Sequence, residues 1–171
     1  MIGLEFEVVP ALDEEECLEL LPCELVQRLS YAKACEVSKR LGSGKLIIGA
    51  DTMVSIGGRV LGKPRDRAHA KQMLEMLSGA THKVYTGITV ICGGTVRTEC
   101  EETSVHFRDI MPGEIEAYLK TGDSMDKAGA YGIQGKAALF IRGIDGDFYN
   151  VMGLPLCRLY KILLEFGAGV M

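Results

Sequence analysis

The chain has 171 residues, 47% of them hydrophobic, and a formal net charge of −4 from 19 basic and 23 acidic side chains. This length predicts a single domain, residues 1–171, with a core of its own. The acidic balance gives no bulk attraction to nucleic acid. No apolar run approaches the ~20 residues that cross a bilayer, and no basic-then-apolar signal stretch opens the chain. We therefore expect a cytoplasmic protein without nucleic acid polymers or membranes as partners.

The six cysteines predict reduced thiols rather than a disulfide framework or a zinc site. No two of them form a C-x-x-C pair, and the three histidines share no ligand spacing. No Ser-His-Asp or Cys-His arrangement stands out either. Covalent catalysis is therefore disfavoured.

The sequence of the first third of the chain predicts a long helix with one strand before it and one strand after it. An alternating pattern that ends at Pro10 indicates a short strand at residues 5–10. Apolar residues at helical spacing after a first-turn proline indicate a helix over residues 22–41. The continuous apolar run of residues 45–50 is typical of a buried strand.

The remaining two thirds of the chain alternate strands with helices. The pairs Gly57-Gly58 and Gly93-Gly94 predict tight turns between strands. The other expected elements are a helix at 66–79, strands at 82–92 and 95–107, a helix that begins at Pro112, a loop at 126–137, a strand at 138–146 and a helix at 154–167. Because the elements interleave without strict βαβ repetition, we expect an α/β fold with a mixed sheet.

The segment GGRVLGKP, residues 57–64, satisfies most of the P-loop pattern G-x-x-x-x-G-K-[ST]. Pro64 stands where that pattern requires Ser or Thr, so a magnesium ligand and a backbone N–H donor are missing. The residues before it also indicate a hairpin. We disfavour an ATPase P-loop, whereas Lys63, between glycine and proline, stays a candidate for phosphate contact.

Asp51 is the most informative acid, because it directly follows the apolar run of residues 45–50. A solvated turn aspartate is the ordinary alternative. A carboxylate at the mouth of a sheet, however, is a usual place for a metal ligand or a general base. The acidic run of residues 13–16 contains Glu14, a second candidate metal ligand, although charge runs are more often solvated faces.

Four lysines from separate segments are candidates for phosphate contact: Lys33, Lys63, Lys83 and Lys127. Each on its own is more often a solvated surface residue. Lys33 lies in the small-residue stretch YAKAC, and Lys127 precedes a glycine-rich loop. Such surroundings suit phosphate contact, because the backbone can approach the ligand as well.

Several segments together resemble the Maf, or septum-formation, family of nucleoside triphosphate pyrophosphatases. In order from Arg28 to about Leu156 they are RLSYAKA, IIGADTMV, LGKP, MLSGATHKVYTG, DKAGAYGIQG and GDFYNVMGLPL. The resemblance implies an elongated, two-lobed Maf/ITPase-like α/β fold with a central cleft. It implies hydrolysis of a nucleoside triphosphate between the α and β phosphates with a divalent metal, Mg²⁺ or Mn²⁺. It also implies a possible homodimer and a link to cell division.

The same resemblance assigns roles to individual residues. Asp51, in GADT, corresponds to the proposed proton acceptor, and Lys33 and Lys63 correspond to lysines that contact phosphates. Thr52 and Gln134 match positions linked to base choice, and AGAYGIQG is similar to the branch that prefers dTTP and UTP. The chemistry agrees, since the Gln134 amide offers both a donor and an acceptor, as a pyrimidine edge requires.

Family members begin with a strand and a turn of the type S-x-S-P-R-R, whose arginines bind the triphosphate. This chain starts at MIGLEFEVVP, which resembles the family segment directly after that turn, so we expect the strand and the arginine turn to be missing. Two interpretations stay open. The leading one is a pyrophosphatase for dTTP and UTP, with modified pyrimidine nucleotides as further candidate substrates. The alternative is a truncated relative that binds a nucleotide but is catalytically impaired.

Overall fold

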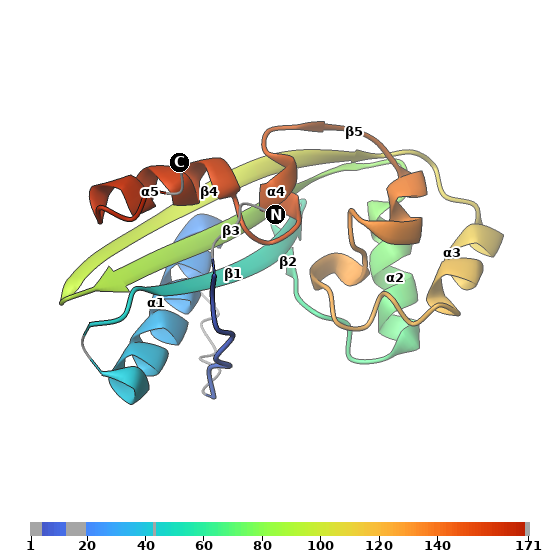
Figure 1. Cartoon of the computed structure of the whole chain (residues 1–171). Coiled ribbons are helices and arrows are strands. Elements are labelled where there is room, and N and C mark those ends of the chain that lie inside the picture. The colour runs from blue at the N-terminus through green and yellow to red at the C-terminus, as the bar shows by residue number, and fades with distance from the viewer. Residues whose placement is uncertain (1–4, 13–19, 43, 170–171) are drawn as a thin grey trace.

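The computed structural model describes residues 5–12, 20–42 and 44–169. Within them, five strands form one sheet in the order β2-β1-β3-β4-β5 (Figure 1). The strands are β1 (Ile47–Ile56), β2 (Arg59–Leu61), β3 (Thr81–Cys92), β4 (Thr95–Phe107) and β5 (Ile141–Asp145). The helices are α1 (Pro22–Leu41), α2 (Arg67–Leu77), α3 (Pro112–Leu119), α4 (Phe148–Val151) and α5 (Leu156–Glu165), with 3₁₀ turns η1 (Ala128–Ala130) and η2 (Gly135–Phe140).

The α/β class is confirmed, but the expected mixed sheet is not. All four strand pairings of the described residues are antiparallel. Tight turns at Gly57-Gly58 and Gly93-Gly94 join β1 to β2 and β3 to β4, and such turns can only return the chain antiparallel. The connection through α2 also leaves and re-enters the sheet at the same end, since Ser55 in β1 pairs with Lys83 in β3.

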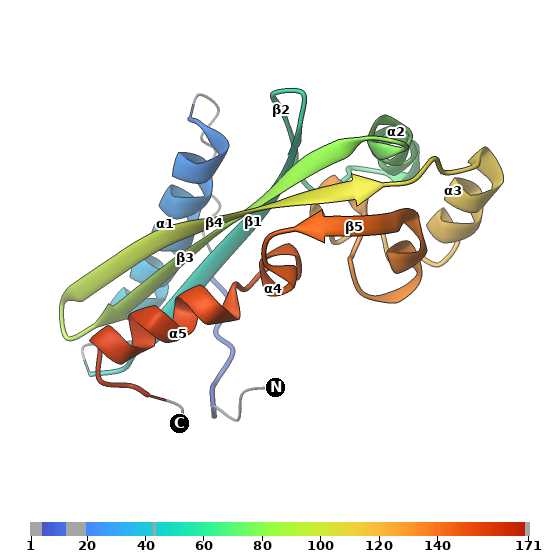
Figure 2. The same ribbon diagram turned by 90° about the horizontal axis from the view of Figure 1, so that it is seen from above.

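Helices α1 and α5 cover opposite faces of the long strands (Figure 2). On one face, Ala34 and Val37 of α1 pack against Ile47 and Ile91. On the other, the α5 side chains Leu159, Ile162 and Leu163 pack against Ile88 and Val90. The alternation of β1 and β3 therefore sends odd-numbered side chains toward α1 and even-numbered ones toward α5.

At the other end of the sheet, α2, α3 and the 3₁₀ turns gather around the ends of β3 and β4 (Figure 1). Their core includes Val54, Leu74, Val84, Phe107 and Tyr131. The molecule therefore has two lobes with separate apolar clusters, joined by the continuous strands β1, β3 and β4. No helix among the described residues combines the length and the hydropathy that a bilayer crossing would need.

Two glycines allow α1 to lie close on the sheet. A Cβ added at Gly87 would lie 2.1 Å from the Val26 carbonyl oxygen of α1, and one added at Gly49 would lie 2.5 Å from that of Ser30. Both neighbours are helix backbone, which cannot move aside as the end of a side chain could. The approach fixes α1 against β1, and with it the position of the Lys33 backbone.

The predicted strand at residues 5–10 is wrong, because this segment has no strand assignment and pairs with no described strand. Val9 instead packs against the apolar cluster between α1 and the sheet, and Arg40 Nη1 donates to the Pro10 carbonyl at 3.0 Å.

The predicted strand at 138–146 begins later than expected. Its first residues belong to the η2 turn, which buries Phe140 in the core.

Candidate active site

Strand β1 does not end at Ala50, as its apolar run suggested, but continues through Asp51 and Thr52 to Ile56. On one side it pairs with β3 along most of its length. On the other side it pairs with β2 only at residues 54–56. Within the described residues, the β1 edge beside Asp51 therefore has no strand partner, which leaves room for a ligand.

The Lys33 ammonium on α1 donates a hydrogen bond to the Asp51 carboxylate. The Asp51 side chain is 16% exposed and that of Lys33 is 38% exposed, so the pair lies at the boundary between protein and solvent. Asp51 is an odd-numbered residue of β1 and faces α1, as its contact with Lys33 requires. A carboxylate and an ammonium are thus held together at the open strand edge.

A pocket of about 360 Å³ surrounds this edge of β1. Thr52 points to the opposite face of the sheet from Asp51, yet both line the pocket because it extends around the unpaired edge. Six of the residues predicted from the sequence meet here: Lys33, Asp51, Thr52, Lys63, Lys127 and Gln134. They come from α1, β1, the segment after β2 and the loop around η1.

The loop of residues 126–134 forms one wall of the pocket and is fixed at several points. The Gly129 amide donates to the Gly62 carbonyl at 3.1 Å, which ties the loop to the residue before Lys63. Lys127 pairs with Asp126 at 2.6 Å. Ala130 is buried with a left-handed φ of 62°. A non-glycine residue in that region costs about 1 kcal/mol or more, and such strain clusters at functional sites.

Tyr131 supports this wall from the core. It is buried, and its hydroxyl lies 2.7 Å from His82 Nε2. Burial raises the pKa of Tyr131. Burial, and secondarily the charge of His106, lowers the pKa of His82 to about 4. Both groups are therefore neutral near pH 7, and they hold the wall without adding charge to the pocket.

Two residues predicted for the site do not join the others. Lys83 is absent from the pocket lining, and its ammonium pairs with Glu102 on β4 at 2.7 Å. Glu14 lies outside the described residues. The histidines are not pocket residues either: His82 contacts Tyr131, His106 pairs with Asp145, and His69 accepts from the Arg65 amide. The five described cysteines are free thiols.

The pocket suits a cation shared with a substrate rather than a cage built by protein alone. The described residues contain no group of three or more His, Cys, Asp or Glu side chains placed to hold a metal. Two carboxylates, Asp51 and Asp126, do line the pocket. Mg²⁺ is commonly bound by one or two carboxylates together with substrate phosphates and water, so this donor set fits such an ion.

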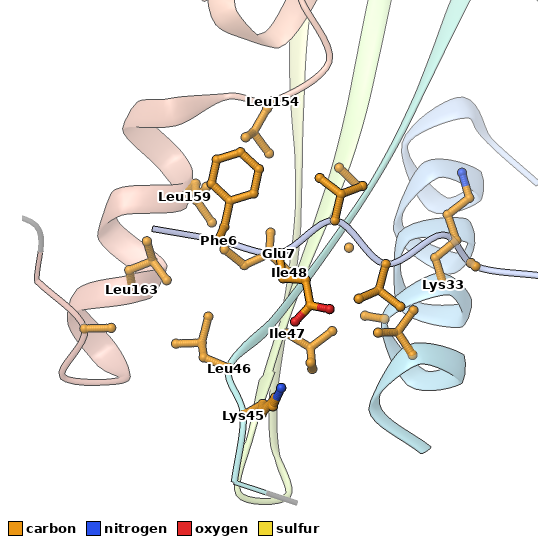
Figure 3. A pocket seen from close by; sticks show the side chains of 18 of the residues that line it. Phe6, Glu7, Lys33, Lys45, Leu46, Ile47, Ile48, Leu154, Leu159 and Leu163 are labelled. Atoms are coloured by element: carbon orange, nitrogen blue, oxygen red, sulfur yellow. The ribbon is translucent and has the colours of Figure 1, made fainter. Parts of the chain in front are cut away.

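A larger, mostly apolar cavity of about 850 Å³ adjoins the pocket, and Lys33, Ala50 and Met152 line both. Figure 3 shows Leu154, Leu159 and Leu163 approaching it from the α5 side, with Lys33 on α1 at its opposite edge. The residues of the segment 5–9 and of the start of β1 also line it. Its apolar walls offer little to a polyphosphate.

Sequence reasoning assigned no role to several residues around the pocket. Asp126 and Gly153 line it, and behind Thr52 lie the buried Thr86 and Asn150. Thr86 is in the VYTG stretch and Asn150 in YNVMG, both within segments that carry the family resemblance. Those segments were the only signal, because a threonine inside a strand or an asparagine in a loop is common in any protein.

Comparisons with known proteins identify relatives over nearly the whole chain. The family model described as Maf-like protein matches residues 1–166. The chain is 48% identical to the dTTP/UTP pyrophosphatase of Symbiobacterium thermophilum over 167 residues, covering 97% of this chain and 86% of that protein. It is 47% identical to the dTTP/UTP pyrophosphatase of Thermococcus kodakarensis over 167 residues, which cover 98% of this chain and 88% of that protein. It is 46% identical to the dTTP/UTP pyrophosphatase of Moorella thermoacetica over 172 residues, which cover 99% of this chain and 88% of that protein.

Proposed function

The chain belongs to the Maf family, and from this premise we propose that its pocket at the β1 edge hydrolyses dTTP and UTP to the monophosphate and pyrophosphate. One observation carries the assignment of the site. Lys33, Asp51 and Lys63, from three separate segments, line the same pocket. This is the arrangement that a polyphosphate needs, since phosphoryl transfer depends on charge neutralisation and positioning more than on covalent chemistry.

The lysines neutralise the triphosphate. Lys63 makes no ion pair with any described residue, so its ammonium is available to a phosphate oxygen. Lys33 and Lys127 each have one carboxylate partner and keep further donors, because an ammonium offers three. Three cations around one triphosphate stabilise the charge that develops on the leaving pyrophosphate.

Asp51 orients and deprotonates the attacking water. The water oxygen forms a bond to the α phosphorus, the bond from that phosphorus to the bridging oxygen breaks, and pyrophosphate leaves with the electron pair. The proton passes to the Asp51 carboxylate, whose second oxygen remains available beside Lys33. The partial exposure of Asp51 lets water reach it from the pocket.

Thr52 and Gln134 contact the base. The Gln134 side chain makes no hydrogen bond with the described residues, so its amide donor and acceptor are both free to pair with a pyrimidine edge. Asp51, with Asp126 nearby, would hold a divalent ion, Mg²⁺ or Mn²⁺, together with the substrate phosphates. When bound, it adds charge neutralisation that the lysines alone do not provide.

The cellular setting is inferred from the same substrates. Free nucleoside triphosphates and reduced thiols are features of the cytoplasm, which is where we place this protein. A homodimer stays a prediction from the family resemblance. Light scattering on the purified protein measures its molar mass in solution and so distinguishes a monomer from a dimer.

The test is pyrophosphate release from dTTP and UTP with Mg²⁺ or Mn²⁺, compared between the unchanged protein and Asp51→Asn. We expect the variant to lose about 10²-fold or more in kcat, as removal of a general base does. Asp66→Asn is a matched control, because Asp66 only caps α2 through the His69 amide. Equal turnover by wild type and Asp51→Asn would remove Asp51 from the mechanism. Calorimetry that shows nucleotide binding without pyrophosphate release would favour the impaired binding module.

A further inference from the structure

We propose that Thr86 is a positioning residue for base choice: bonded to the Asn150 carbonyl, it fixes the Thr52 hydroxyl as a hydrogen-bond acceptor toward the pocket and so selects pyrimidines that carry a proton on N3. The inference rests on the proposed function, since it requires a pyrimidine base beside Thr52. It concerns residues behind the pocket wall that do not touch the substrate themselves.

The three groups form a short chain of hydrogen bonds. Thr52 and Thr86 are cross-strand partners on β1 and β3, and their hydroxyl oxygens are 2.9 Å apart. The Thr86 hydroxyl lies 2.9 Å from the backbone carbonyl oxygen of Asn150. Thr86 and Asn150 are both fully buried, whereas Thr52 reaches the pocket. The chain therefore runs from the interior to the substrate side.

The direction of these bonds is set by the chemistry of the groups. A carbonyl oxygen can only accept, so the single hydroxyl proton of Thr86 goes to Asn150. The Thr86 oxygen then has only lone pairs left for Thr52, and Thr52 must donate its own proton inward. What Thr52 presents to the pocket is an oxygen with lone pairs and no proton.

The anchor of this chain is rigid. The Asn150 side-chain amide donates to the Val84 carbonyl at 3.0 Å and to the Thr103 hydroxyl at 2.9 Å. The Asn150 carbonyl also accepts from the Gly153 amide at 2.9 Å. A Cβ added at Gly153 would lie 3.4 Å from Thr52 Oγ1, so this turn lies directly beside the hydroxyl. If Thr86 instead donated its proton to Thr52, the Thr86 hydroxyl oxygen and the Asn150 carbonyl oxygen would face each other without a proton between them.

An acceptor at this place discriminates between pyrimidines. Uracil and thymine carry a proton on N3 and can donate to Thr52. Cytosine has a lone pair on N3, so two acceptors would face each other and neither could be satisfied in the pocket. A site built for a hydrogen bond rejects an analogue that cannot make it, because its own polar group is then left unpaired.

The first experiment compares kcat/KM for UTP and CTP in wild type, Thr86→Val and Thr86→Ser. Valine keeps the shape of threonine but frees the Thr52 hydroxyl to turn and donate to cytosine N3. We expect the preference for UTP over CTP to fall about tenfold in Thr86→Val and to stay near the wild-type value in Thr86→Ser. The Asn150 carbonyl keeps its bond from Gly153, so the valine variant leaves no unpaired carbonyl. An unchanged ratio in Thr86→Val, or equal ratios in both variants, would overturn the proposal.

A second experiment needs no variant. 3-Deazauridine triphosphate carries a C–H group where UTP has N3–H, and we expect wild type to hydrolyse it about tenfold less efficiently than UTP. Equal efficiency would show that no acceptor reads N3, which contradicts the inference whatever the variants do. If wild type hydrolyses neither UTP nor dTTP with metal, the proposed function itself fails. If it hydrolyses UTP and only the discrimination is missing, this inference alone fails.

Discussion

The ammonium of Lys33, in the middle of α1, donates to the carboxylate of Asp51, in the middle of β1. The two residues are far apart in the chain and meet because α1 lies unusually close to the sheet over Gly49 and Gly87. The contact closes the α1 side of a pocket at an unpaired strand edge. A substrate phosphate can compete for Lys33 there and leave an Asp51 oxygen free for water.

Replacement of this lysine should separate activity from stability. For Lys33→Met we expect kcat/KM for UTP to fall about 10²-fold, the usual cost of removing one charge-stabilising donor. Because the pair is partly exposed, unfolding free energy should change by less than about 1 kcal/mol. Lys71→Met is the matched control, since Lys71 lies on α2 and pairs with Glu116 at 2.8 Å, away from the pocket. Similar losses of activity in both variants would argue against a specific role for Lys33.

The close approach of α1 should make Gly87 intolerant of a side chain. In Gly87→Ala the new Cβ would lie 2.1 Å from the Val26 carbonyl oxygen, so helix or strand must shift. We expect a loss of about 2–3 kcal/mol in unfolding free energy, measured by urea denaturation. Gly113→Ala, which meets nothing within 4 Å in the first turn of α3, should instead gain about 0.5 kcal/mol. A stable Gly87→Ala variant would contradict the packing of α1.

Stability should fall in mild acid because of His82. The folded protein holds the pKa of His82 at about 4, below its ordinary value of 6.5, mainly through burial. Between these two values the unfolded chain binds a proton that the folded protein excludes. The contribution of His82 to stability is therefore complete above about pH 6.5 and is lost progressively as the pH falls toward about 4.

The measurement for His82 is the unfolding free energy at pH 7 and pH 4.5 in wild type and His82→Gln. Glutamine can still bond the Tyr131 hydroxyl but does not titrate. Wild type should lose about 2 kcal/mol more than the variant over this interval. The comparison cancels the carboxylates, which titrate in both proteins. Identical acid losses would show that His82 is protonated as readily in the folded protein as in the unfolded chain.

Metal dependence should appear only together with the nucleotide. Because the described residues form no complete metal cage, EDTA should abolish pyrophosphate release but leave the melting temperature of the nucleotide-free protein unchanged. With the α,β-methylene analogue of dTTP present, Mg²⁺ should raise the melting temperature, since a ligand that binds the folded state stabilises it. A large effect of EDTA on the protein alone would indicate a structural metal instead.

Much of the fold is predictable from local sequence signals, and the exceptions have physical causes. Helix α1 begins and ends as predicted, because a first-turn proline and the Gly42 cap mark its ends. The β1–β2 and β3–β4 turns are marked by paired glycines. The segment 5–10 has the alternation of a strand but lacks a described partner, and a strand needs a partner that local sequence does not reveal. Strand direction likewise depends on where α2 re-enters the sheet.

The charged residues that line the pocket were predictable from the sequence, but the residues that lie behind its wall were not. Asp51 stands out after an apolar run, and the family resemblance identifies Lys33 and Lys63. Lys83 lies in an equally polar setting in the sequence, and strand alternation puts it on the same face of the sheet as Asp51. Its ammonium, however, pairs with Glu102 on β4, and it does not line the pocket. The bond between Thr86 and Asn150 joins residues 64 positions apart. Such contacts arise only from tertiary packing.

The most direct test of the central claim is a crystal structure with Mg²⁺ and the α,β-methylene analogue of dTTP, which cannot be hydrolysed at the reacting bond. We predict phosphate oxygens within hydrogen-bond distance of the ammonium groups of Lys33 and Lys63, the α phosphorus facing the Asp51 carboxylate, and the base beside Thr52. A triphosphate bound elsewhere, for example beside Lys83, would contradict the account. So would a nucleotide that contacts neither Lys33 nor Asp51.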